Sequence, residues 1–253
     1  MIGDAFSLRN LLVLALVGCH AQPRAEARRD VVVLVSANSE WRALETVVHG
    51  VAGSTPVGET LEAGGLLYLH GGWGKIDAAL SAQYAIDRWH PRLLVNLGTC
   101  GGFAGAVKPD DVVLVDRTVV YDIVERMGDP KEAIDAYATS IDLAWLHPPA
   151  GTVRGTIVSA DQDLDPARLG ELAAAYHAIA ADWESGSIAR VAAKNHTRVL
   201  ILRGVSDVVS PAGDVTYGKI ENFDQAAQHV MQRLVTLLQS SLASQPLPAR
   251  SIE

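Results

Sequence analysis

The sequence is poor in cysteine, with only Cys19 and Cys100 among its 253 residues. Two cysteines form at most one disulfide, and none within a single chain if Cys19 carries another modification, so stability must come from a hydrophobic core. The eight histidines show no HxxxH spacing and the cysteines no CxxC spacing. These absences argue against a structural or catalytic metal, and we expect no cofactor.

Positive charge is scarce as well. The chain has 21 Lys and Arg against 29 Asp and Glu, a formal net charge of −8, and no long block of like charge. A polyanion is repelled by such a surface, so we exclude polymeric nucleic acid as a partner. The hydrophobic share of 49% and the length instead fit one ordered globular domain with a substantial core.

The N-terminus contains no apolar run long enough to cross a membrane. Its longest run, Leu11–Val17, is far shorter than the ~20 residues that a spanning helix needs. The run follows the basic residue Arg9, as in the apolar region of a secretory signal. The stretch LVGC, which ends in Cys19, resembles the lipobox of bacterial lipoproteins and implies lipidation of that cysteine.

We therefore predict an exported protein whose membrane contact is a lipid anchor at Cys19, in the periplasm or at the cell surface. An ordinary signal peptide cut after Ala21 is one alternative, and a cytoplasmic protein with a misassigned start codon is another. The expected segments are a signal peptide over 1–19, a polar tether over 20–30, a catalytic domain over 31–243 and a C-terminal tail over 244–253.

From residue 31 on, short apolar stretches alternate with amphipathic ones. Continuous Val, Ile and Leu runs separated by helices indicate a sheet that is covered on both faces. Ligands of such sheets bind beyond the strand ends. The predicted strands cover 31–37, 66–72, 92–98, 111–120 and 197–204, and the predicted helices begin near 39 and cover 75–89, 165–179 and 219–238.

Four predicted strand ends carry acidic or glycine-rich segments. Glu40 follows the first strand, the stretch NLGTCGGFAG the third, Glu184 precedes a helix of small residues, and Asp207 follows RVLILRG. Each has a structural explanation, such as a charge at a helix N-terminus or a turn. However, all four converge at one edge of the sheet, where glycines also let backbone approach a ligand. The pattern predicts a binding site at that edge.

Five segments together resemble the nucleoside phosphorylase/nucleosidase superfamily, in particular the methylthioadenosine/S-adenosylhomocysteine nucleosidases. The resemblance covers roughly residues 31–240 in the same order. It implies a three-layer α/β sandwich around a central, partly mixed twisted sheet, a homo-oligomer (dimer or higher) and a nucleoside as small-molecule partner. The segments are VVLVSANSE, GGWGKIDAAL, VNLGTCGGFAGAVKPDDVVLVD, DWESGSIA and RGVSDVV.

The resemblance also implies roles that suit cleavage of an N-glycosidic bond. Such cleavage needs an acid on the leaving base and negative charge near an oxocarbenium-like ribose. Asp207 matches the general acid, Glu184 the carboxylate that binds the ribose diol, and Glu40 the base that activates water. Ser206 would orient Asp207, while Thr99 and Arg203 match positions that hold the water or its ion-pair network. The substrate-binding candidates are Thr99, Cys100, Gly101, Gln162, Asp163, Leu164, Trp183, Arg203 and Ser206.

The nucleophile is the main open choice. Many phosphorylases of the superfamily carry an arginine for phosphate where this chain has Asn96, and Glu40 would repel a phosphate dianion. We therefore predict hydrolysis, with phosphorolysis as the alternative if Arg42 turns inward. An exported nucleoside-binding lipoprotein is a further alternative, although buried carboxylates without a catalytic use are costly.

Departures from the resemblance concern the substrate. Asp163 aligns with an aromatic residue that stacks on the base, and a carboxylate cannot stack in that way. Asp163 or Gln162 would then hydrogen-bond a different base edge, or an aromatic residue would come from elsewhere. Trp183 replaces a Met beside the ribose and Trp73 replaces an aliphatic residue, and both serve either packing or binding. The stretch 120–150 matches poorly, so we expect a purine nucleoside but leave the base and the 5′ substituent open.

Overall fold

The computed structural model describes residues 28–212 and 220–249, so the expected signal peptide, Cys19 and most of the tether lie outside the described residues. The strands are β1 (Val31–Val35), β2 (Val51–Thr55), β3 (Gly58–Ala63), β4 (Leu66–His70), β5 (Leu93–Phe103), β6 (Val112–Val120), β7 (Ala138–Ser140), β8 (Thr152–Ser159), β9 (Ala178–Asp182) and β10 (Val199–Val209). The helices are α1 (Asn38–Val47), α2 (Gly74–Trp89), α3 (Pro130–Ala136), α4 (Leu169–Tyr176), α5 (Ser185–Lys194) and α6 (Ile220–Ser244), with a 3₁₀ turn at Pro166–Arg168.

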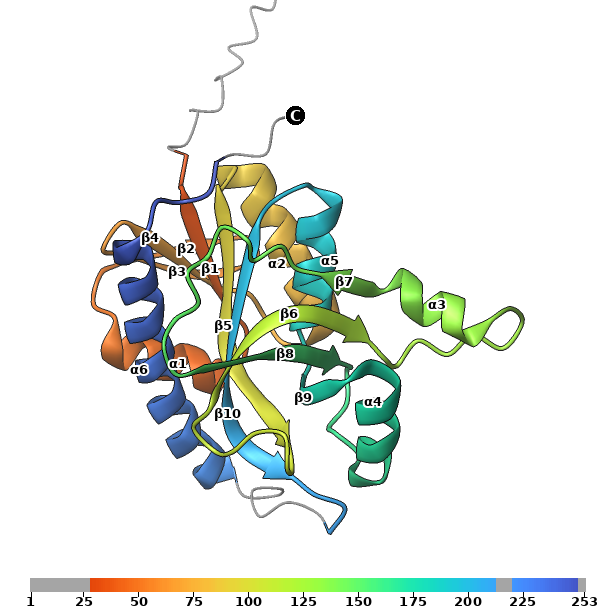
Figure 1. The fold of residues 1–253 in the computed structure, drawn as a ribbon. Coiled ribbons are helices and arrows are strands. Elements are labelled where there is room, and N and C mark those ends of the chain that lie inside the picture. Colours follow the sequence, from red (N-terminus) through yellow and green to blue (C-terminus); the bar gives the residue numbers. More distant parts are fainter. Residues whose placement is uncertain (1–27, 213–219, 250–253) are drawn as a thin grey trace, which may run out of the picture.

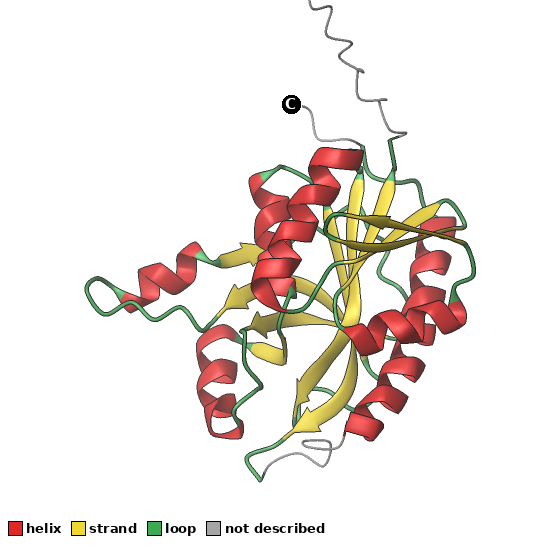
Figure 2. Cartoon of the chain, turned by 180° about the vertical axis from the view of Figure 1, so that it is seen from behind, coloured by secondary structure: helices red, strands yellow, loops and turns green. Residues whose placement is uncertain are grey.

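The strands form one mixed sheet with helices on both faces (Figure 1). β5 pairs in parallel with β1 and β10, whereas β9 pairs with β5 and β6 pairs with β10 in the antiparallel sense. α1 packs against α6 on one face, and α2 packs against α5 on the other, as the view from behind also shows (Figure 2). The expected partly mixed sheet between two helical layers is therefore confirmed.

Five of these strands pair in a closed cycle. β10 pairs with both β5 and β6, and β6 leads through β8 and β9 back to β5. We call this set the closed ring. The register shifts within it, between Val205 and Asp207 for example, are bulges of the kind that bend strands toward closure.

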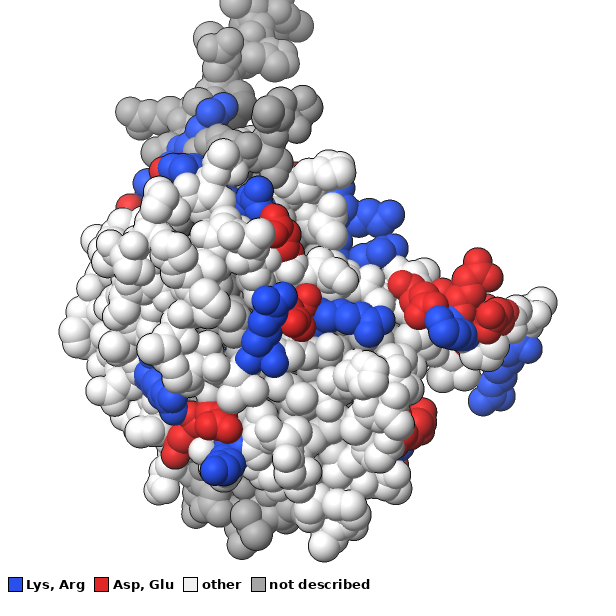
Figure 3. Space-filling model, viewed as in Figure 1, with Lys and Arg blue, Asp and Glu red and all other residues white. Residues whose placement is uncertain are grey.

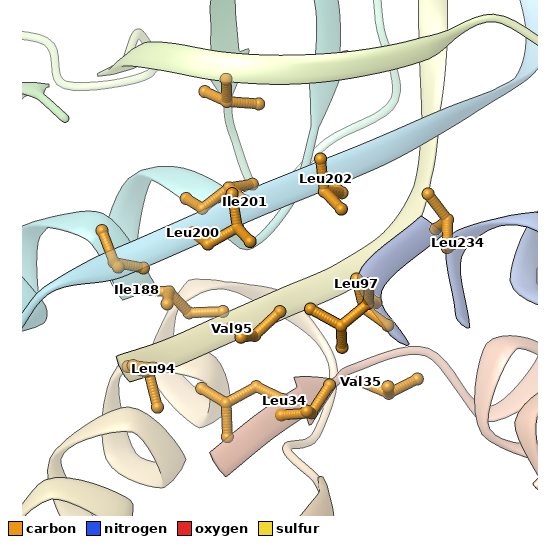
Figure 4. Close-up of a cluster of buried hydrophobic side chains, with 14 of the residues drawn as sticks. Leu34, Val35, Leu94, Val95, Leu97, Ile188, Leu200, Ile201, Leu202 and Leu234 are labelled. Atoms are coloured by element: carbon orange, nitrogen blue, oxygen red, sulfur yellow. The ribbon is translucent and has the colours of Figure 1, made fainter. Parts of the chain in front are cut away.

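The core lies where the central strands meet the two helical layers (Figure 4). Leu34 of β1, Val95 of β5 and Ile201 of β10 are fully buried, as are Ile188 of α5 and Leu234 of α6. Because both faces are covered, every residue of β1 is buried, which explains its unbroken Val and Leu sequence.

Several predicted elements end elsewhere than expected; the strand predicted over 92–98, for example, continues to Phe103, so the glycine run lies within β5. The strand predicted over 197–204 continues past the bulge to Val209, so Asp207 lies inside a paired strand rather than after its end. The helix predicted over 165–179 ends at Tyr176, because His177 takes a left-handed conformation (φ 54°) and turns the chain into β9. The hairpin β2–β3 and strands β7, β8 and β9 were not predicted.

Both ends of the described chain are attached to the domain. Arg29 forms an ion pair with Glu62 at 2.7 Å, and Arg92 donates to the carbonyls of Leu247 and Pro248 at 2.8 and 3.0 Å. The expected tether and tail therefore have their domain-proximal residues packed on the fold. No helix in 28–212 or 220–249 is long and apolar enough to cross a membrane.

An arm formed by β7 and α3 projects from the body (Figure 1). On the face shown in Figure 3, acidic and basic side chains lie together in small mixed groups, including those on this arm. Two surface ion pairs of the described chain, Arg154 with Asp116 at 2.8 Å and Arg198 with Asp142 at 2.6 Å, are of this kind. Exposed pairs like these contribute little to stability.

Candidate active site

A cavity of about 630 Å³ opens at one edge of the sheet, a size typical of small-molecule sites. The three catalytic candidates, Glu40, Glu184 and Asp207, all line it. Arg203 is the one substrate-binding candidate that does not. The lining residues are Ala37, Asn38, Ser39, Glu40, Arg42, Trp73, Thr99, Cys100, Gly101, Gln162, Asp163, Leu164, Ala181, Asp182, Trp183, Glu184, Ser206, Asp207, Val209 and Phe223.

Arg203 lies behind the cavity wall, with a fully buried side chain on β10. Its Nη2 is 2.8 Å from Asp182 Oδ2 and 3.2 Å from Glu184 Oε2, and its Nη1 is 3.8 Å from Glu40 Oε1. Nη2 also donates to Asn96 Oδ1 at 2.9 Å. Arg203 therefore positions three carboxylates instead of touching a ligand itself.

One cation among three buried carboxylates leaves excess negative charge. The pKa of Glu184 is raised to about 8: burial is the largest cause, Arg203 opposes the rise, and the negative charges of Asp182 and Glu40 add to it. Removing a carboxylate from water disfavours its charged form, as does a like charge nearby. The raised pKa places the ionisation of Glu184 close to the neutral range.

Glu40 is fixed from two sides. It lies in the first turn of α1 and is only 2% exposed. Its Oε1 accepts hydrogen bonds from the backbone N–H of Thr99 at 2.6 Å and from the Thr99 hydroxyl at 2.8 Å, while Oε2 accepts from the N–H of Ala37 at 3.1 Å. The Glu40 side chain thus accepts a free backbone N–H at the N-terminus of α1 and also lines the cavity.

Gly98 has a different function from the one predicted for the glycine run. A Cβ at this position would lie 2.0 Å from Arg203 Nη1 and 2.8 Å from Glu40 Oε1. At Gly102 a Cβ would lie 2.5 Å from a methyl group of Val107. These two glycines make room for side chains of the protein, not for a ligand.

Asp207 projects from β10 just after the bulge, and its side chain is partly buried. The hydroxyl of Ser206 lies 2.5 Å from Asp207 Oδ1 and 3.3 Å from the carbonyl of Cys100. Ser206 therefore contacts the carboxyl group that we expect it to orient. Burial raises the pKa of the Cys100 thiol well above its usual value, so this cysteine contributes a neutral side chain to the wall.

Glu184 lies at the N-cap position of α5 but does not cap that helix. Its Oε1 instead accepts the N–H of Gly74, the first residue of α2, at 3.2 Å. Asp182, two residues before the N-cap, accepts the N–H of Ser185 on its Oδ2 at 3.2 Å and the hydroxyl of Ser159 on its Oδ1 at 2.5 Å. Sequence reasoning did not identify these two serines: Ser159 ends β8 and Ser185 is the first residue of α5, after the N-cap.

Two tryptophans form part of the wall beside Glu184. Trp73, which is 63% exposed, stacks on Trp183 with ring centroids 5.2 Å apart and planes 27° apart. The sequence left packing and binding as alternatives for these residues; Trp73 and Trp183 pack on each other and both line the cavity. Stacked rings of this kind present a rigid apolar surface.

Lys75 connects the start of α2 to the segment after β8. Its ammonium group forms hydrogen bonds with the carboxylate of Asp122 and lies 3.7 Å from Asp161 Oδ2. Its backbone N–H donates to Asp161 Oδ1 at 2.7 Å. Sequence reasoning missed this cluster, because its members are far apart in the chain and carry no spacing signal.

The groups considered for phosphate binding are arranged unfavourably for it. Asn96 is fully buried, binds Arg203 and the carbonyl of Leu34, and does not line the cavity. The side chain of Arg42 is 62% exposed and lies 3.6 Å from Asp224 Oδ1. The wall itself is rich in carboxylates, which repel a dianion.

Comparison with known proteins gives a consistent result. A family model described as the phosphorylase superfamily matches residues 42–243. The chain is 27% identical over 191 residues to the 5′-methylthioadenosine/S-adenosylhomocysteine nucleosidase of Bacillus velezensis, which covers 68% of this chain and 80% of that protein.

Two solved structures from Helicobacter pylori share the fold. One is an MTAN mutant with 5′-methylthioadenosine in its active site (TM-score 0.69, 16% identity, covering 85% of this chain and 99% of that one). The other is futalosine hydrolase (TM-score 0.69, 17% identity, covering 85% and 97%). At these identities the likeness concerns the fold.

Proposed function

The chain belongs to the phosphorylase superfamily, and we propose that it hydrolyses the N-glycosidic bond of a purine nucleoside. The observation that carries the proposal is the arrangement of Glu40, Glu184 and Asp207 around one cavity, with Arg203 fixed behind the first two. The distant nucleosidase relatives support the reaction class. The acidic wall supports water over phosphate as the nucleophile.

Each carboxyl group has one step in this reaction. The Asp207 acid donates its proton to N7 of the base, so the electron pair of the breaking C1′–N9 bond leaves with a neutral purine. Glu184 accepts hydrogen bonds from the 2′- and 3′-hydroxyls. The oxygen of water then bonds to C1′ while Glu40 takes its proton. The negative charge of Glu40 and Glu184 also stabilises the oxocarbenium-like ribose.

The first experiment is base release from a nucleoside panel in phosphate-free buffer. Free base and free ribose support the hydrolase. Release that requires phosphate and yields ribose-1-phosphate identifies a phosphorylase, for which the cavity-lining Arg42 is the candidate phosphate ligand. Binding without release identifies a nucleoside-binding protein.

Glu184→Gln should lower kcat/KM more for ribonucleosides than for 2′-deoxynucleosides. A hydrogen bond to a charged group is worth roughly 1.5–3 kcal/mol, so we expect a loss of about 10- to 100-fold in kcat/KM for the ribonucleoside. The deoxy substrate has already lost one of the two contacts and should lose less. Steady-state kinetics on matched pairs of substrates measure this, and equal losses would exclude the diol role.

The pH profile tests the same residue independently. Glu184 accepts hydroxyl protons best as a carboxylate, and its pKa is raised to about 8. Ionisation therefore increases as the pH rises toward 8, and kcat/KM for a ribonucleoside should rise with it. The glutamine variant should lack this rise. A wild-type profile that falls between pH 6 and 8 would contradict the assignment.

We also propose that the protein is a homo-oligomer that associates through α2. Trp73, Ile76 and Leu80 lie on one face of this helix and are 63%, 81% and 55% exposed. This stripe begins at the cavity wall, where Trp73 stacks on Trp183. Replacing Ile76 and Leu80 with Glu should convert a dimer or larger species to monomers in light scattering, whereas Ile76→Val should not. A monomeric wild type would refute the proposal.

Export and lipidation of Cys19 stay a proposal, since that segment lies outside the described residues.

A further inference from the structure

An ion cluster next to the cavity has no step in the proposed reaction. It consists of Lys75, the second residue of α2, Asp122, which follows β6, and Asp161, which follows β8. None of the three lines the cavity, although their sequence neighbours Trp73 and Gln162 do. The side chains of Lys75 and Asp122 are only 19% and 20% exposed. Removing charges from water is costly unless close contacts offset the cost, so the contacts of this cluster indicate its role.

Each member of this cluster, which we call the lysine clamp, contacts the other two. The ammonium group of Lys75 forms hydrogen bonds with both oxygens of Asp122 and lies 3.7 Å from Asp161 Oδ2. The backbone N–H of Asp161 donates to Asp122 Oδ2 at 3.1 Å. Hydrogen bonds between charged groups are among the stronger ones. The clamp therefore fixes the start of α2 to the segments that follow β6 and β8.

The start of α2 has no cap of its own. Trp73 is the N-cap and provides no side-chain hydrogen bond, so the first N–H groups of the helix need acceptors from elsewhere. Asp161 Oδ1 accepts the N–H of Lys75 at 2.7 Å, and Glu184 Oε1 accepts the N–H of Gly74 at 3.2 Å. Gly74 has a φ of 82°, and a Cβ there would lie 2.9 Å from Asp161 Oδ1. The clamp and the donor to Glu184 are thus adjacent on one backbone.

Glu184 has one such donor on each carboxylate oxygen. Its Oε2 lies 3.2 Å from Arg203 Nη2, and its Oε1 accepts the Gly74 N–H. Without the second donor the carboxylate could turn about its terminal bond, and its two oxygens would no longer be fixed as a pair. A ribose diol uses such a pair, because each of its hydroxyls can donate to one oxygen.

The same two donors affect the charge of Glu184. Burial raises the pKa of this carboxyl most, and the charges of Asp182 and Glu40 add to the rise. Arg203 and the Gly74 N–H lower the pKa. Loss of the Gly74 donor should therefore raise the pKa of Glu184 further, because a hydrogen bond to the charged form favours that form.

We propose that Lys75 is a positioning residue for Glu184, because the clamp fixes the start of α2 with the Gly74 N–H at that carboxylate. The inference rests on the proposed function, in which Glu184 binds the ribose diol. A clamp with a purely structural role would contribute to the free energy of unfolding. It would leave the titration of Glu184 and the discrimination between ribose and deoxyribose unchanged.

Kinetics compare wild type with Lys75→Met, the conservative Lys75→Arg and the control Lys131→Met. Lys131 forms an exposed ion pair with Asp135 on α3, so its loss should change nothing. Lys75→Met should lower kcat/KM for a ribonucleoside at neutral pH by about 10-fold, the lower end for a hydrogen bond to a charged group. The loss for the 2′-deoxynucleoside should be smaller, and Lys75→Arg should restore most of the activity. Added to Glu184→Gln, Lys75→Met should cause little further loss, since both act through one group.

A second measurement needs no activity. The side-chain carboxyl carbon of Glu184 is titrated by NMR in protein with labelled glutamate, and Glu184→Gln assigns the signal. Lys75→Met should raise the midpoint by at least ~0.5 pH unit, the size expected for weakening one hydrogen bond to a carboxylate. Asp122→Asn, which also tests the proposal if Lys75→Met does not fold, loosens Lys75 and should raise the midpoint too. The lost negative charge of Asp122 would by itself lower the midpoint, so a lower value would refute positioning.

The two proposals can fail separately. If no nucleoside is cleaved but the midpoint rises in Lys75→Met and Asp122→Asn and not in the control, the catalytic proposal fails and the positioning of Glu184 by the clamp stands. If nucleosides are cleaved but the midpoint is unchanged, or Lys75→Met lowers kcat/KM equally for ribo- and deoxynucleosides, the positioning is refuted while hydrolysis stands.

Discussion

Asp207→Asn should lower kcat for nucleoside cleavage by at least ~100-fold, the lower range for removing a positioned proton donor. Asparagine has the same shape, so the hydroxyl of Ser206 can still hydrogen-bond to its Oδ1 as it does to that of Asp207. What is lost is the acidic proton that the leaving purine requires. The measurement is single-turnover base release at saturating nucleoside, which separates chemistry from binding.

A matched control makes the result specific. Asp116→Asn removes a carboxylate that pairs with Arg154 at the surface, and it should retain full activity. Both variants should unfold at the wild-type temperature within a few degrees. A folded Asp207→Asn protein with near-normal kcat would remove this residue from the mechanism. Substrates whose bases leave without protonation should be much less sensitive, which distinguishes an acid from a binding group.

Glu40→Gln should abolish hydrolysis while nucleoside binding survives. The expected loss in kcat is about 10²–10⁴-fold, the usual range for a general base. Glutamine retains an oxygen that can accept from Thr99, although its NH2 group cannot accept the N–H of Ala37 as Oε2 does, and it cannot take a proton from water. Its Kd for the substrate, measured by calorimetry, should therefore remain close to that of wild type.

The conservative variant Thr99→Ser provides the control for Glu40. A serine hydroxyl still donates to the carboxylate that Thr99 Oγ1 now contacts at 2.8 Å, so most activity should remain. If Glu40→Gln weakens binding as much as turnover, Glu40 is a binding group. If phosphate restores the rate of the Glu40→Gln variant and ribose-1-phosphate is formed, water is not the nucleophile in this protein.

The sequence predicted the parts of the fold that have a strong pattern. β1 and α6 were found because one is uniformly apolar and the other has an apolar stripe. The hairpin β2–β3 was missed because β2 is almost wholly exposed and its sequence, VAGST, lacks the alternation of a half-buried strand. β2 is held in the sheet by its hydrogen bonds to β3 and not by burial of its side chains.

The candidate site could be predicted only where one residue carries its own signal. Glu40, Glu184 and Asp207 were identifiable as acids near strand ends. The function of Arg203 was not fully visible, since a buried arginine is explained only by the three carboxylates that surround it in space. Similarly, Gly98 was recognised as unusual, but the guanidinium that needs its missing side chain is more than 100 positions away in the chain.

The closed ring has a consequence for how this protein can change over evolutionary time. Asp207 and Thr99 project from strands of the ring, which has paired neighbours on all sides, so almost any backbone alteration there disturbs chemistry. Trp73 and Asp163 belong to connecting segments after β4 and β8, which tolerate substitution more readily. The substrate range can therefore evolve through a few surface connections, while the proposed general acid Asp207 stays under constraint. New nucleoside specificities can be sought by diversifying those connections alone.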